Sequence, residues 1–233
     1  MTIRSRVAVI VLAVLAQGAF SVGCSSTVEL SRKQRKRIHT VSVSSVELKD
    51  DTIQYMGPII EGYDPVSPVF LAVPLLRELA LLYCVTPFGM WHISDAYHQM
   101  EAALTRRVVD SGVDVEYVVR QRFVQKLRQT DMFTIVSSKD ADAQVRIDIE
   151  TGLTPSNGWF GHGVQPWLVV NAVMKDGEER VVWRKEAEVS SFAKQLPSRE
   201  PKLFFRKPEL FEESFRIAVR LAVEELVTHL RQG

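Results

Sequence analysis

The sequence predicts an α+β fold in which a mostly antiparallel sheet of about four or five strands carries two amphipathic helices on one face. Several short segments alternate apolar and polar residues, as half-buried strands do, and two longer segments repeat apolar residues at the helical period. An Asp-Gly pair at Asp176 and Gly177 joins two of the strand segments as a hairpin. All the apolar stripes are buried together if both helices lie on the same face of the sheet.

The chain opens with the features of a secretory signal peptide. Arg4 and Arg6 precede the apolar run Val7–Ala16, and mostly small residues lead from that run to Gly23. The run is about half the length that a bilayer-spanning helix needs, which disfavours a permanent transmembrane helix. Residues 1–23 are therefore predicted to be the signal peptide.

The predicted signal peptide ends at a cysteine. The stretch Ser21, Val22, Gly23 and Cys24 resembles the lipobox of bacterial lipoproteins, with Ser21 where that family usually has Leu. The resemblance implies that the Cys24 thiol receives a diacylglycerol, that the chain is cut before Cys24, and that the new amine takes a further acyl chain such as palmitate. Several acyl chains on one residue anchor a protein stably. The alternative is an ordinary signal peptide followed by a free cysteine.

The resemblance also gives an expected location. Ser25 follows Cys24, and in the enterobacterial members of the family a serine at this place permits transfer to the outer membrane. We therefore expect the cell envelope, with the periplasmic face of the outer membrane favoured over the plasma membrane.

The composition of the remaining 210 residues fits one globular domain. They hold 27 basic and 28 acidic residues, a formal net charge of −1, which gives no electrostatic reason to expect nucleic acid as a partner. With Cys24 acylated, Cys84 has no cysteine to pair with, so no internal disulfide is expected.

A basic run lies close to the predicted anchor. Residues 24–38 are expected to be the lipidated cysteine and a tether, and residues 39–233 the single domain. Five of the six residues from 32 to 37 are basic, and they are either a solvated run or a patch that contacts anionic headgroups, where each charge contributes about 1 kcal/mol. The expected contact residues are Arg32, Lys33, Arg35, Lys36 and Arg37.

The strand segments are read from their period of two. In residues 143–151, Val145, Ile147 and Ile149 alternate with charged residues, which is the clearest strand pattern in the chain. In the second arm of the hairpin, an apolar face is expected to include Trp183 and Ala187. The expected strands are Thr40–Leu48, Met132–Ser138, Ala143–Thr151, Leu168–Met174 and Val181–Ser191.

An apolar helical insertion is expected at about residues 66–110. Val69–Val85 is the most apolar part of the mature chain, and it is a core helix, a membrane-dipping segment or a partner-binding surface. Pro87 and Gly89 are expected to break the chain, and Ser94 to cap a helix from Asp95 to about Val109.

Two further helices supply the layer that covers the sheet. Asp114–Arg128 places Val115, Val119, Phe123 and Leu127 on one face. The last helix, about Pro208–Leu230, carries a longer stripe, which consists of Phe211, Phe215, Ala218, Val219, Ala222, Leu226 and Leu230.

The sequence offers no catalytic, metal or cofactor motif. The five histidines are scattered without the HExxH spacing of zinc enzymes. Cys84 and His92 could suggest a thiol nucleophile, but the apolar surroundings of Cys84 disfavour a thiolate. The glycines of Asn157–Gly163 do not fit a phosphate loop, so this stretch is either a loop with exposed aromatics or, with Trp159, Phe160 and Trp167, a contact surface for a partner.

The order of elements resembles that of a known class of protein, although the sequence contains no motif that is diagnostic of this class. Arg120–Glu150, with a helix, a strand, an acidic turn and a strand, resembles small envelope lipoproteins such as the lipoprotein subunit of the lipopolysaccharide translocon and the auxiliary lipoproteins of lipid transport. The resemblance implies a non-enzymatic accessory or assembly/transport factor that is anchored through Cys24 and binds an envelope protein. The alternatives are a membrane-inserting or pore-forming lipoprotein, which would use Val69–Val85, and a cell-envelope hydrolase.

Overall fold

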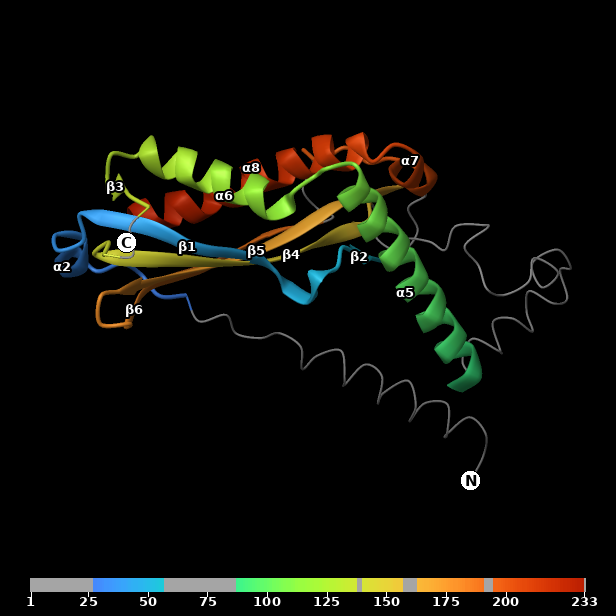
Figure 1. The fold of residues 1–233 in the computed structure, drawn as a ribbon, viewed down its shortest axis with the longest axis horizontal. Coiled ribbons are helices and arrows are strands. Elements are labelled where there is room, and N and C mark those ends of the chain that lie inside the picture. The colour runs from blue at the N-terminus through green and yellow to red at the C-terminus, as the bar shows by residue number, and fades with distance from the viewer. Residues whose placement is uncertain (1–26, 57–86, 138–139, 157–162, 191–194, 233) are drawn as a thin grey trace, which may run out of the picture.

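The computed structural model describes residues 27–56, 87–137, 140–156, 163–190 and 195–232. Figure 1 shows a long, twisted sheet with two helices lying along one of its faces. The predicted α+β class is confirmed, and so is the packing of two amphipathic helices on one face.

The centre of the sheet is an antiparallel meander. β4 (Ala143–Pro155) pairs with β5 (Val164–Asp176), and β5 pairs with β6 (Val181–Val189). The predicted hairpin is confirmed, because Asp176 ends β5 and its carboxylate accepts hydrogen bonds from the backbone N–H groups of Glu178 and Arg180.

The remaining strands are short or pair in parallel. The sheet has six strands, in the order β3-β1-β4-β5-β6, with β2 (Gln54–Tyr55) also on β4. β1 (Thr40–Leu48) has the predicted bounds and runs parallel to β4 and to β3 (Thr134–Ile135). Local sequence patterns carry no information on strand direction, and β2 is not among the expected strands.

The two covering helices bury the predicted stripes. α6 (Val115–Arg128) begins after Asp114, whose side chain accepts a hydrogen bond from the Tyr117 N–H. α8 (Glu209–Gln232) lies over β5 and β6 and follows Pro208 directly. Every residue of both predicted stripes is buried, and full burial of a large apolar side chain contributes about 1.5–3 kcal/mol.

The far end of the sheet carries α5 (Pro87–Asp110), α7 (Pro201–Arg206) and β2. α5 begins at Pro87, so the expected chain break there and the Ser94 cap were wrong: proline lacks only an N–H that the first helical turn does not use. α5 side chains bind the backbone of β2 and of the residue before it, as the Ile53 N–H donates to Thr105 and the Tyr55 N–H donates to Glu101. The segment Val69–Val85 lies outside the described residues.

Candidate functional site

The chain joins the folded domain four residues after Cys24. The backbone N–H and C=O of Val28 bond with the C=O and N–H of Arg184 in β6, at 3.0 and 2.9 Å. Leu30 is fully buried in the core. From Val28 onward, the stretch expected to be a tether is held against the domain.

The basic run folds as a short capped helix. α2 (Arg32–Arg35) begins after Ser31, and Ser31 and Gln34 form a reciprocal capping box. The Arg35 guanidinium donates to the carbonyl oxygens of Leu230 and Arg231 at 3.1 and 3.0 Å, at the end of α8. Arg35 therefore satisfies carbonyl groups that the helix leaves open and joins α2 to α8.

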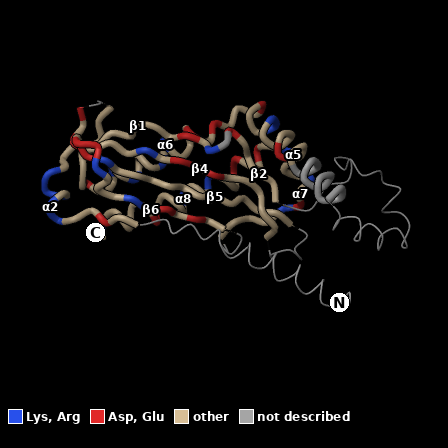
Figure 2. The backbone as a smooth tube through the Cα atoms, turned by 90° about the horizontal axis from the view of Figure 1, so that it is seen from below, with Lys and Arg blue, Asp and Glu red and all other residues tan. Residues whose placement is uncertain are grey.

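The four other basic residues of this run are exposed, and they lie together at one end of the molecule. Arg32, Lys33, Lys36 and Arg37 all belong to α2 or to the turn that follows it. Figure 2 shows these blue positions at the tip of the tube, near the C-terminal end of α8. We call these four residues the basic tip.

Acidic residues beside the basic tip are used in local hydrogen bonds. Backbone N–H groups of Thr40 and His39 donate to the Asp142 carboxylate, each at 2.8 Å, and these bonds lower the pKa of Asp142. Arg180 binds the Asp176 carboxylate at 2.7 Å and lowers its pKa. Both carboxylates therefore hold the ends of strands in place at this end of the sheet.

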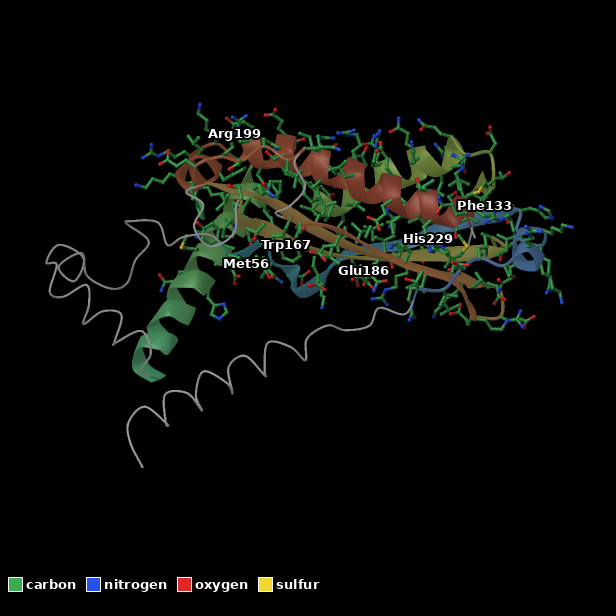
Figure 3. The ribbon with its side chains drawn as sticks, turned by 180° about the vertical axis from the view of Figure 1, so that it is seen from behind. Met56, Phe133, Trp167, Glu186, Arg199 and His229 are labelled. Atoms are coloured by element: carbon green, nitrogen blue, oxygen red, sulfur yellow. The ribbon has the colours of Figure 1, made fainter. Side chains whose placement is uncertain are left out.

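Trp167, one of the expected partner-contact aromatics, lies toward the opposite end of the sheet. Trp167 is half-buried on β5, opposite Gly152 of β4, on the face that the helices do not cover. Met56, which is 45% exposed, lies at the same end (Figure 3). Trp159 and Phe160 lie outside the described residues.

The uncovered face of the sheet carries charged side chains. Arg146 of β4 lies between Glu47 and Asp148, with N–O distances of 3.2 and 3.0 Å, and Lys49 binds Glu150 at 2.7 Å. Figure 2 shows this face with acidic and basic positions along β4, β5 and β6. These pairs are exposed ion pairs and contribute little stability individually.

The three histidines whose side chains are described lie on different parts of the fold. His39 is exposed, and His98 lies 3.3 Å from Glu101 on α5. His229 accepts a hydrogen bond from the Trp183 indole at 3.1 Å. Within the described residues, no three His, Cys, Asp or Glu side chains are grouped as metal ligands. Cys84 lies outside the described residues, and the side chain of His92 is likewise not described.

Among the helices that the structure describes, none combines the length and the apolar character needed to cross a bilayer.

Comparisons with known proteins give partial likenesses of the fold. A protein from Xanthomonas campestris of family DUF330 matches 50% of this chain and 63% of its own, with 16% identity and a TM-score of 0.34. A candidate lipoprotein from Caulobacter crescentus matches 51% of this chain and 81% of its own, with 12% identity and a TM-score of 0.31. This chain thus spans less than two thirds of the Xanthomonas protein, and no property of either protein is carried over at these scores. No family model and no curated protein matches the sequence.

Sequence reasoning missed that α2 is part of the fold. The Ser-x-x-Gln spacing from Ser31 to Gln34 is a capping-box signature and could have indicated a helical turn. The bonds of Arg35 to α8 have no local signal, because Leu230 is 195 positions further along the chain.

Proposed function

We propose that this protein is a lipid-anchored, non-enzymatic lipoprotein of the bacterial cell envelope that serves as an accessory or assembly/transport factor for a membrane partner. Its anchor is acylated Cys24, and its bilayer is the outer membrane, at the periplasmic face. The observation that carries the proposal is the short connection between Cys24 and Val28, next to the basic tip.

Chain length limits how far the domain lies from the bilayer. Four residues span at most about 14 Å when fully extended. An acylated Cys24 therefore holds Val28, and the edge of β6 to which Val28 is bonded, close to the headgroups. The basic tip begins four residues after Val28, at Arg32, and four exposed cations in this position attract anionic lipids.

The first test is mass spectrometry of the mature N-terminus, together with a Cys24→Ser variant. We expect a chain that begins at Cys24 and carries three acyl chains, and we expect Cys24→Ser to leave the membrane fraction. An unmodified Cys24 in the membrane-bound protein would contradict the proposal.

A second test compares the basic tip with basic residues elsewhere on the surface. Replacing Arg32, Lys33, Lys36 and Arg37 by Gln is expected to weaken binding of the Cys24→Ser protein to anionic vesicles and to leave stability nearly unchanged. The control variant also replaces four basic residues by Gln, but on the helices α6 and α8. These residues are Arg122, Lys126, Arg128 and Arg220. Equal losses of vesicle binding in both variants would show that net charge, and not the basic tip, sets the contact.

A further inference from the structure

The two edges of the sheet differ in how their backbone groups are used. At one edge, β3 pairs only with Thr40 and Val41 of β1, and the Val41 carbonyl accepts from the Val136 N–H. Val43 lies two residues further along β1, so its carbonyl faces the same edge. Arg120 of α6 donates to this carbonyl at 2.9 Å, and α6 thereby occupies a backbone group that β3 leaves open.

The other edge is formed by β6, and it is paired at one position. Val28 bonds to Arg184 through both backbone groups. Because outward-facing residues alternate along a strand, Glu186 and Glu188 present their N–H and C=O groups to the same side as Arg184. Within the described part of the chain, no hydrogen bond reaches these outward groups of Glu186 and Glu188.

Beyond Arg184, the described residues protect this stretch of β6 by charge alone. Proteins block free edges with charged side chains, proline, a bulge or a covering element. Residues 184–189 contain no proline, and the register irregularity between β5 and β6 falls near the hairpin turn, at Met174 and Lys175. The one lysine in the stretch, Lys185, is held by Glu225 of α8 at 2.9 Å.

Charge selects among the strands that could occupy the edge. Glu186 and Glu188 lie opposite Asn171 and Val169 of β5, so no cation faces them across the strand pair. Because Arg184 is already paired with Val28, a second copy of β6 would bring glutamates against glutamates, which is destabilising, whereas a strand with cations at alternate positions would bring opposite charges together. Figure 3 shows Glu186 on the same side of the sheet as Trp167.

We propose that the edge of β6 from Lys185 to Val189, beyond the pair of Arg184 with Val28, binds an extended segment of a partner protein with Lys or Arg at alternate positions, added as a further strand. The partner's backbone supplies the hydrogen bonds, and its cations pair with Glu186 and Glu188. This inference adds a contact surface to the accessory role proposed above. It rests on that role for the identity of the partner as an envelope protein.

The test measures amide hydrogen exchange of the processed full chain in non-ionic detergent, with two synthetic probes, KVKVKVK and EVEVEVE. In the free protein, we expect fast exchange at Glu186 and Glu188 and slow exchange at Ala187, whose N–H faces β5. The lysine peptide is expected to slow exchange at both glutamates and to bind about tenfold more tightly than the glutamate peptide.

Two variants carry the same change of charge. Glu186→Lys with Glu188→Lys is expected to reverse the preference between the peptides, whereas Glu209→Lys with Glu213→Lys, on α8, is expected to leave it unchanged. Slow exchange at both glutamates in the free protein would mean that residues 24–27 of this chain already pair with the edge of β6. This result would overturn the proposal. Equal binding of the peptides, or protection at another surface, would also overturn it. None of these outcomes depends on acylation of Cys24, so failure here is distinct from failure of the membrane anchor.

Discussion

At the scale of single residues, the hydrogen bond between Trp183 and His229 joins β6 to α8. The Trp183 side chain is fully buried, and its indole N–H donates to His229 Nδ1. His229→Ala leaves this donor buried without an acceptor, which costs about 1–3 kcal/mol. We expect His229→Ala to lower the free energy of unfolding in urea by this amount, and His229→Gln to recover part of the loss. Equal losses in the two variants would show that the acceptor is unimportant.

Gly152 is a second residue whose identity the structure explains, because there is no room for a side chain at this position. A Cβ atom at this position would overlap the backbone carbonyl of Gln54 in β2 and lie 2.8 Å from Trp167 Nε1. Gly152→Ala is therefore expected to push β2 away from β4 and to destabilise the protein by about 1–3 kcal/mol.

The matched control for Gly152 is Gly177→Ala in the hairpin turn, where a Cβ atom meets nothing within 4 Å. This variant is expected to change the urea unfolding free energy by less than about 0.5 kcal/mol. A similar loss in both variants would contradict the close approach of β2 to Gly152.

At the scale of elements, Asp142 holds the start of β1 against the start of β4. Its folded-state pKa lies below the ordinary value of 3.8, so its contribution to stability is complete above about pH 4. The contribution is lost as the pH falls through the folded pKa. We expect Asp142→Asn to be less stable than the parent near pH 7 and the gap to narrow toward pH 3. Asp110→Asn, at the exposed end of α5, is the control, and a gap that is constant with pH would contradict the role of the carboxylate.

Elements whose residues repeat at a regular period are predictable from sequence. The alternation in β1 gives its bounds, and the stripes of α6 and α8 give the faces that they bury, because apolar burial acts locally along each element. The parallel pairing of β1 with β4 depends on where the two strands meet in space, and no local pattern records it.

The candidate site, like the fold, is only partly predictable from the sequence. The run of five basic residues and Cys24 are visible in the sequence, and the exposure of the basic tip agrees with a charged run. That Arg35 binds the end of α8, and that Val28 pairs with β6, result from contacts between segments more than 150 positions apart, which a linear reading does not contain.

At the scale of the whole molecule, the proposed anchor and the sheet together predict an orientation. β4 has 13 residues, so it spans about 40 Å at ~3.3 Å per residue, and it runs from the end with α2 to the end with α5 and α7. If Cys24 is acylated as proposed, the lipid lies within about 14 Å of Val28, and we expect the α2 end to lie at the bilayer and the α7 end tens of ångströms away.

This orientation is checked by fluorescence quenching with brominated lipids in the acylated protein. In a Cys84→Ser background, bimane on Lys33→Cys of α2 is expected to be quenched, and bimane on Arg206→Cys of α7 is expected to be unaffected. A flexible linker of about 15 residues between Ser26 and Thr27 would extend the reach of the anchor by roughly 20 Å and reduce the difference between the labels. Quenching of Arg206→Cys in the parent chain would mean that the sheet lies flat on the bilayer, because one short tether cannot bring both ends of an upright sheet to the headgroups.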